Sequence, residues 1–284
     1  MPKTIAIIGA LDKEVHLVRD AVENARERND AGLAVVEGEF AGCHVVATTA
    51  GMGTVNAAAT TQYLISMFNA DAVIFSGIAG GLNPALHIED VVIGERLRYL
   101  DTDTALIAES APGLEEFAST PALVDVAESV LLDRGYVLAT HSACRCVGSK
   151  TDTCDLADAG SVAVGEVFAA GTATATSADS AAGANSNAQQ YLRGTIATGD
   201  RFVSGSAMRD VAIEATHADC VEMEGAAIAH IAAKNGVDCL ILRAISDNCD
   251  EEYDKLCTRE FDLEEYAEGA SSIVLEIVRR IAAA

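Results

Sequence analysis

The chain has 284 residues, of which 50% are hydrophobic and 5% aromatic, and its 43 acidic residues against 19 Lys and Arg give a formal net charge of −24. This balance excludes a nucleic-acid partner, because phosphate contacts need clustered Lys and Arg. No apolar run is as long as a membrane span, and the N-terminal apolar stretch is interrupted too soon for a signal peptide. We therefore expect a cytoplasmic protein without membrane contact, whose eight cysteines stay reduced.

Short apolar runs alternate with helical patterns along the chain. The predicted strands are residues 4–8, 33–39, 44–49, 72–76, 90–98, 195–198 and 239–245. The predicted helices are residues 11–24, 53–68, 121–133, 220–235 and 263–283. Alternation of this kind predicts an α/β fold with three layers, in which helices flank both faces of a mixed β-sheet.

Residues 140–192 break this alternation. They are rich in Ala, Gly, Ser and Thr, and they offer little bulky apolar surface to bury. A segment of this length without periodicity inside a compact domain is usually an insertion or a mobile loop. We therefore predict a single domain over residues 1–284, with a low-complexity insertion at about 140–192.

Carboxylates stand where the predicted strands and helices begin or end. Asp247 is at the tip of an apolar strand, where a carboxylate has no structural use without a partner. Glu14 follows the first strand, and Glu222 and Glu224 stand at the start of an Ala-rich segment. Glu14, Glu222 and Glu224 could simply favour a helix N-terminus, but ligands of open α/β sheets bind beyond the carboxyl ends of the strands. The four carboxylates thus predict one site, with Asp247 as the candidate catalytic acid.

Two glycine-rich segments lie beside predicted elements. Gly51-Met52-Gly53 opens a predicted helix, and the GIAGG sequence at 77–81 follows a predicted strand. Such turns let a backbone approach a ligand, but neither segment has the spacing of a dinucleotide fingerprint. We interpret both as tight turns. Phe202 lies beside glycines, and its side chain could either be exposed in a loop or be buried in the core.

Taken in order, six segments resemble the 5′-methylthioadenosine/S-adenosylhomocysteine nucleosidase family, which has the nucleoside phosphorylase-like fold. They are IIGALDKEV at 7–15, GIAGGL at 77–82, RYLDTD at 98–103, TGDRF at 198–202, VEME at 221–224 and RAISD at 243–247. Each motif is short, but the ordered set is specific. The resemblance covers nearly the whole chain except about residues 140–192.

The resemblance implies hydrolysis of the N-glycosidic bond of 5′-methylthioadenosine and S-adenosylhomocysteine, a step of methionine salvage that releases adenine and the thioribose. It implies that Asp247, oriented by Ser246, protonates adenine N7. It also implies that Glu14, assisted by Arg243, activates the attacking water. The substrate-binding residues implied are Phe202, Val203, Met223, Glu224, Glu222, Ile78, Ala79, Gly80 and Phe261.

Within that set, the resemblance assigns a contact to each part of the substrate. Glu224 would hold the ribose hydroxyls, and Met223 would pack on the sugar. Phe202 would stack on adenine, while the backbone of Val203 reads the adenine edge. Phe261 would cap the substrate.

Departures from the family leave the 5′ specificity open. Ile78 replaces a small polar residue, and residues 104–109 lack an aromatic-rich sequence that the family often has. An aminodeoxyfutalosine nucleosidase would use the same catalytic residues. A nucleoside phosphorylase is disfavoured, because neither glycine-rich segment contains Arg or Lys to hold phosphate. A catalytically idle nucleoside-binding protein is the third alternative.

The resemblance implies a homodimer that binds an adenine nucleoside and needs no cofactor and no metal. His141, Cys144, Cys146 and Cys154 could bind a metal ion, but the Cys-x-Cys spacing without a second cysteine pair favours free thiols.

Overall fold

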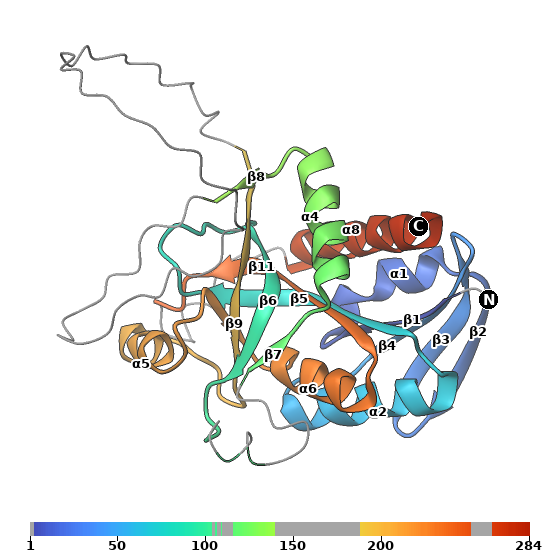
Figure 1. The fold of residues 1–284 in the computed structure, drawn as a ribbon, viewed down its shortest axis with the longest axis horizontal. Coiled ribbons are helices and arrows are strands. Elements are labelled where there is room, and N and C mark those ends of the chain that lie inside the picture. The colour runs from blue at the N-terminus through green and yellow to red at the C-terminus, as the bar shows by residue number, and fades with distance from the viewer. Residues whose placement is uncertain (1–2, 104–105, 107–108, 110–115, 140–187, 251–262) are drawn as a thin grey trace, which may run out of the picture. The chain divides into compact units, whose positions relative to one another are not determined.

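The computed structural model describes residues 3–103, 106, 109, 116–139, 188–250 and 263–284. Among them, one sheet contains β1 (Thr4–Gly9), β2 (Glu23–Asp30), β3 (Leu33–Phe40), β4 (Cys43–Thr49), β5 (Ala72–Gly81), β6 (Val91–Tyr99), β7 (Phe117–Ala118), β8 (Val137–Leu138), β9 (Gln190–Thr198), β10 (Cys220–Glu222) and β11 (Asp238–Asp247) (Figure 1). The helices are η1 (Asp12–Glu14), α1 (His16–Ala21), α2 (Thr54–Phe68), α4 (Pro121–Asp133), α5 (Ser206–Thr216), α6 (Gly225–Asn235) and α8 (Leu263–Ala283).

The strand order is β10-β9-β6-β11-β5-β1-β4-β3-β2, with β7 beside β6 and β8 beside β9. β1 pairs parallel with β4 and β5, and β5 pairs parallel with β11. β6 is antiparallel to β11, so the sheet is mixed. β5 also pairs with β10, through Gly81 with Cys220 and Gly80 with Val221. The pairings of β5, β11, β6, β9 and β10 therefore close into a ring.

Helices cover both faces of the sheet (Figure 1). Ile5 and Ile7 of β1 belong to the apolar cluster that α1, α4 and α8 share with one face. Ala6 and Ile8 belong to the cluster that α2 and α6 share with the other face. Successive side chains of a strand point to opposite faces, so one continuous apolar run supplies both layers. The predicted α/β fold with a mixed sheet between helices is confirmed.

The predicted helix over residues 11–24 is confirmed only in part. The chain forms the short η1 and α1 there, and β2 begins at Glu23. The side chain of Glu14 caps the start of this segment by accepting hydrogen bonds from the amides of Ala10 and Leu11. β2 carries no apolar alternation because all of its residues are exposed, so no sequence pattern indicated this edge strand.

Two further predictions need correction. Residues 77–81 are not a tight turn, because β5 continues through them to Gly81. Glycine is required here by proximity, since a Cβ added at Gly80 would lie 2.1 Å from the Sγ atom of Cys249. The predicted helix over 220–235 begins only at Gly225, and its first residues form β10.

The remaining predicted elements agree with the structure within a few residues, except that β9 begins earlier, at Gln190. The last residues of the range 140–192 therefore belong to the sheet, while residues 140–187 lie outside the described part of the chain. Sequence patterns missed α5 entirely. No helix within the described ranges is long and apolar enough to cross a membrane.

Candidate active site

The ends of β1, β5 and β11 and the turn from β10 to α6 surround a cavity of about 190 Å³. Its lining residues are Ala10, Leu11, Glu14, Met52, Ile78, Ala79, Gly80, Arg201, Phe202, Val203, Val221, Glu222, Met223, Glu224, Ser246, Asp247 and Cys249. Of the predicted site residues that the structure describes, all except Arg243 line this cavity. Phe261 lies outside the described residues.

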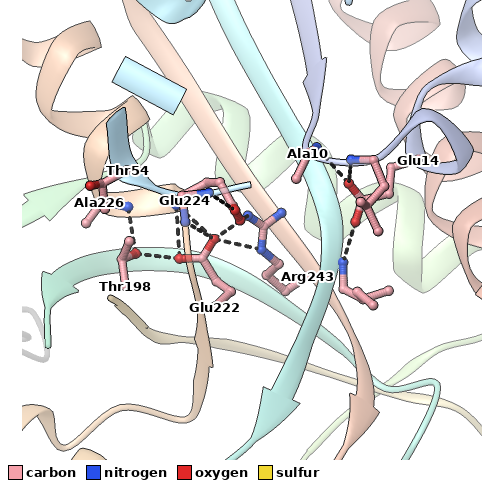
Figure 2. A network of polar contacts seen from close by, with 12 residues as sticks. Ala10, Glu14, Thr54, Thr198, Glu222, Glu224, Ala226 and Arg243 are labelled. Atoms are coloured by element: carbon pink, nitrogen blue, oxygen red, sulfur yellow. Dashed lines mark hydrogen bonds and ion pairs between the residues drawn. The ribbon is translucent and has the colours of Figure 1, made fainter. Parts of the chain in front are cut away.

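Glu14 is buried in the floor of the cavity and is held by backbone amides. Its Oε2 accepts hydrogen bonds from the amides of Ala10 at 2.7 Å and Leu11 at 2.9 Å, and its Oε1 from the amide of Ile78 at 3.2 Å (Figure 2). Burial raises the pKa of Glu14, while the charge of Arg243 and the three amides act in the opposite direction. A carboxylate held in this way is oriented by the backbone and available as a proton acceptor.

Asp247 is the last residue of β11 and is 7% exposed. Ser246 Oγ lies 2.8 Å from its Oδ2, and the amide of Cys249 donates to its Oδ1 at 2.8 Å. The carbonyl oxygen of Ala79 lies 3.2 Å from the same Ser246 Oγ. The side chain expected to be the acid is therefore fixed at both oxygens, at the end of the strand.

Glu222 is engaged by protein groups on both carboxylate oxygens (Figure 2). Its Oε1 accepts a hydrogen bond from the hydroxyl of Thr198, and its Oε2 pairs with the guanidinium of Arg243. The amide of Gly225 donates to both oxygens, and that of Glu224 to Oε2 at 3.0 Å. Although Glu222 lines the cavity, these contacts make it an anchor for the turn rather than a free acceptor.

Arg243 lies behind the cavity, 1% exposed, with its guanidinium carbon 4.0 Å from the centre of the Phe75 ring. Burial lowers the pKa of Arg243, but the carboxylates of Glu222, Glu224 and Glu14 outweigh it and keep the guanidinium charged. A Cβ added at Gly77 would lie 2.5 Å from Glu14 Oε1 and 3.0 Å from Arg243 Nη1. Gly77 therefore leaves open the space between the carboxylate and the guanidinium.

Glu224 lies between the cavity and Glu222, the residue that fixes the turn from β10 to α6. Its Oε1 accepts a hydrogen bond from the amide of Gly53 at 2.8 Å, at the start of α2, and its Oε2 is 3.7 Å from Arg243 Nη2. Burial and the neighbouring charge of Glu222 raise the pKa of Glu224 to about 7, while Arg243 and the amide act against this rise. The sequence suggested neither the Gly53 contact nor the role of Thr198, because both join segments that are distant along the chain.

The mouth of the cavity is more exposed and more apolar than its floor. Phe202 is 44% exposed and Met52 is 61% exposed, whereas Val203 is buried. The aromatic ring of Phe202 is therefore at the cavity and not in the core, which resolves the two interpretations of this residue. Lining residues that sequence reasoning did not single out include Met52, Arg201 and Cys249.

A second cavity, of about 440 Å³, is lined by residues of β5, β11 and α8 among others. One of its lining residues is Ser76, whose buried Oγ atom has no hydrogen-bond partner among the described residues. Arg243 is its only predicted site residue. The smaller cavity, which collects the buried carboxylates, is therefore the candidate active site.

Within the described ranges, no group of three or more His, Cys, Asp and Glu side chains is arranged to hold a metal ion. Cys43, Cys220, Cys239 and Cys249 are buried and form no disulfide. His141, Cys144, Cys146 and Cys154 lie outside the described residues, so the interpretation of that set as free thiols stays a prediction.

Residues 4–279 match the model of the phosphorylase superfamily, and the chain belongs to this superfamily. Its relatives include the 5′-methylthioadenosine/S-adenosylhomocysteine nucleosidases of Bacillus thuringiensis, 31% identical over 251 residues, and of Bacillus subtilis, 28% identical over 282 residues. The alignment covers 86% of this chain and 85% of the first relative, and 98% and 99% for the second. The resemblance found in the sequence motifs is thereby confirmed.

Solved structures agree. The structure of a 5′-methylthioadenosine/S-adenosylhomocysteine nucleosidase from Neisseria meningitidis, in complex with methylthio-immucillin-A, matches with a TM-score of 0.73 and 29% identity, and the match covers 98% of this chain and 99% of that one. A futalosine hydrolase of Helicobacter pylori matches with a TM-score of 0.72 and 24% identity, over 98% of each chain. At that identity the second similarity concerns the fold alone.

Proposed function

We propose that this protein hydrolyses the N-glycosidic bond of 5′-methylthioadenosine and S-adenosylhomocysteine, releasing adenine and the free thioribose sugar. The observation that carries the proposal is that three buried carboxylates, Glu14, Glu224 and Asp247, line one cavity with an aromatic side chain at its mouth. Carboxyl groups in distinct environments can divide the roles of proton donor and proton acceptor. The nucleosidase relatives support this choice of substrate.

In the proposed reaction the C1′–N9 bond breaks and its electron pair stays with adenine. Asp247 donates its proton to N7, so that a neutral base leaves. A water molecule adds to C1′ and gives a proton to Glu14, with the charge of Arg243 nearby. Glu224 accepts hydrogen bonds from the ribose hydroxyls, Phe202 stacks on adenine, and Met223 packs on the sugar.

Water is the preferred nucleophile on electrostatic grounds. A phosphate nucleophile brings at least one negative charge, and phosphate sites are built from Arg, Lys or helix N-termini. In this cavity the described lining residues include four carboxylates and a single cation, Arg201. That charge distribution opposes a phosphate close to the buried carboxylates.

The test is incubation of the purified protein with 5′-methylthioadenosine, with and without phosphate, while adenine and the sugar product are followed by chromatography. We expect adenine and free methylthioribose in both conditions. Sugar 1-phosphate formed only with phosphate would identify a phosphorylase instead. Cleavage of aminodeoxyfutalosine alone would identify the protein as an aminodeoxyfutalosine nucleosidase. Binding of these nucleosides without turnover would identify it as a catalytically idle nucleoside-binding protein.

Replacing the proposed acid provides the matched variant. Asp247→Asn removes the proton donor, and we expect kcat to fall by about 10²–10⁴-fold, with smaller loss of affinity for an adenine nucleoside analogue. Asp250→Asn, which makes the same change at an exposed residue three positions later, is the control. Equal activities of the two variants would contradict the assigned role.

We also propose that the protein is a homodimer, as its resemblance to the nucleosidase family implies. Met52 and Val55 are exposed apolar residues on either side of the first residue of α2, 61% and 78% exposed, and Met52 also lines the cavity. Light scattering coupled to size-exclusion chromatography measures the mass, and a monomer at micromolar concentration would contradict the proposal. Val55→Asp should shift a dimer toward monomer if Val55 is buried in it.

A further inference from the structure

The chain turns sharply directly after Asp247. Cys249, two residues later, has a φ of 55°, a left-handed conformation that costs free energy in a residue other than glycine. Its amide donates to Oδ1 of Asp247 at 2.8 Å, which is the carboxylate oxygen that Ser246 does not contact. The orientation of the Asp247 carboxylate therefore depends on this turn keeping its conformation.

Arg209 of α5 binds the backbone of this turn. Its Nε donates a hydrogen bond to the carbonyl oxygen of Asn248 at 3.0 Å, and its Nη2 donates to that of Leu82 at 2.7 Å. Asn248 directly follows β11 and Leu82 directly follows β5, so one guanidinium joins the ends of two neighbouring strands. Because the donors of a guanidinium lie in one fixed plane, the two contacts constrain both the separation and the direction of these carbonyl groups.

The same contacts connect the proposed acid to the segment proposed to contact adenine. α5 begins at Ser206, three residues after Val203, so Arg209 belongs to the element that continues this segment. The helix buries only two of its residues, and apolar packing alone therefore holds it weakly. The hydrogen bonds of Arg209 thus join the three chain segments that carry Gly80, Val203 and Asp247, which all line the cavity.

We propose that Arg209 is a positioning residue that holds Asp247 in the place from which it protonates the adenine leaving group. The inference rests on the proposed nucleosidase function. Proton transfer needs the donor within hydrogen-bond reach of the base, and a small displacement of a positioned group lowers the rate steeply. Arg209 is not among the described residues that line the cavity. Its loss should therefore act on kcat, to which the acid contributes, more than on KM.

The first test replaces Arg209 by residues that keep its apolar stem. Arg209→Met removes both hydrogen bonds, and we expect kcat for 5′-methylthioadenosine to fall by roughly 10- to 100-fold, with KM changed by less than about threefold. Arg209→Lys keeps a charged donor that can bind one carbonyl oxygen, and it should recover part of kcat. A kcat of Arg209→Met equal to that of the natural protein would overturn the proposal.

A double-mutant cycle separates the positioning of Asp247 from a general loss of structure. If Arg209 acts through Asp247, then Arg209→Met lowers kcat in the natural protein but has little further effect in Asp247→Asn, whose proton donor is already absent. A role in folding alone lowers the activity by the same factor in both backgrounds. That second result would overturn the proposal.

Arg134→Met is the matched control. Arg134, which directly follows α4, also joins two elements, because its guanidinium donates to the Oγ atom and the carbonyl oxygen of Ser272 in α8, at 2.7 and 2.8 Å. It does not line the candidate active site. The variant loses two hydrogen bonds of the same kind, and we expect its kcat to stay unchanged. An equal fall of kcat in Arg134→Met and Arg209→Met would overturn the proposal.

Hydrogen exchange, measured by nuclear magnetic resonance, needs no turnover and so separates this inference from the function on which it rests. The amide of Cys249 is protected by its hydrogen bond to Asp247. If the natural protein cleaves no adenine nucleoside, the proposed function is wrong, and the exchange rate of this amide decides whether Arg209 holds Asp247. Faster exchange in Arg209→Met than in the natural protein and in Arg134→Met would support that role. Equal exchange in all three proteins would overturn it.

Discussion

The pKa of Glu224 is about 7 because burial and the adjacent Glu222 both oppose its charge, and Arg243 compensates only in part. A carboxyl group with this pKa changes its role near neutrality. Ionised, it accepts hydrogen bonds from ribose hydroxyls, and protonated it loses part of this capacity. The amide of Gly53 also favours the ionised form.

We predict that kcat/KM falls as the pH drops through about 7, because the proposed ribose contact needs the Glu224 carboxylate. In Glu224→Gln the activity is lower and this acid limb is absent. The measurement is the pH profile of adenine release between pH 5 and 9, with Asp250→Asn as the control. An unchanged limb in Glu224→Gln would assign the titration to another group.

The raised pKa of Glu224 also makes the stability of the protein depend on pH. The pKa of Glu224 rises from 4.5 to about 7 on folding, so the folded protein binds more protons between these values. Its contribution to the free energy of unfolding therefore decreases as the pH rises across that window, by at most about 1.4 kcal/mol per pH unit. The free energy of unfolding, measured with urea, should decrease less from pH 5 to pH 7 in Glu224→Gln than in the natural protein.

At the scale of the element, the turn from β10 to α6 depends on a contact from β9. The hydroxyl of Thr198 donates to Glu222 and accepts from the amide of Ala226 at 2.8 Å. It therefore joins the end of one strand, the carboxylate of the next strand and the first turn of the helix. Glu224 is the residue just before that helix, so its position depends on the same contacts.

We predict that Thr198→Val destabilises the protein by about 1–3 kcal/mol, because a buried amide and a buried carboxylate oxygen each lose a partner. It should also lower kcat/KM by displacing Glu224, and Thr198→Ser should restore both. Thr61→Val is the control, since Thr61 is equally buried but its hydroxyl donates only within α2. Equal stability losses and equal activities in the two valine variants would contradict the role of Thr198.

Elements with strong apolar patterns were predictable. α4 was expected over its observed residues, because proline at its start and apolar residues on one side mark it clearly. β2 and α5 were missed, since β2 is exposed along its whole length and α5 buries only two residues. Local patterns report burial, so elements that bury little leave no periodic signal.

At the scale of the whole molecule, the excess of negative charge opposes folding. Surface ion pairs such as those of Arg193 with Glu95 and Glu128 offset part of it. Each exposed pair contributes at most about 1 kcal/mol. The 43 acidic residues outnumber the 19 Lys and Arg, so repulsion between carboxylates is the larger effect.

We therefore predict that NaCl stabilises this protein. Raising the concentration from 0.05 to 1 M shortens the screening length to roughly 3 Å and should raise the free energy of unfolding by about 1–2 kcal/mol. Thermal unfolding followed by circular dichroism measures the effect. Chloride is preferred to sulfate, because sulfate also strengthens apolar burial. A melting temperature that stays constant or falls with salt would show that ion pairs outweigh the repulsion.

By itself the sequence determined the α/β alternation and the candidate chemistry of the site. Apolar runs such as that of β11 are a local property, and so is the carboxylate of Asp247 at the end of this run. Short motifs in a fixed order indicated the resemblance to the nucleosidase family. These features depend on neighbours along the chain, which is why they are visible without coordinates.

Only the tertiary structure decided how the carboxylates meet. β10 runs antiparallel to β5, so a rule about the carboxyl ends of parallel strands does not place Glu222 beside Asp247. The closed ring of pairings does so, by bringing Val221 opposite Gly80. Contacts between distant segments, such as Gly53 with Glu224 or Thr198 with Glu222, arise from this closure. No local pattern encodes them, because the free energy that selects them comes from packing the whole sheet.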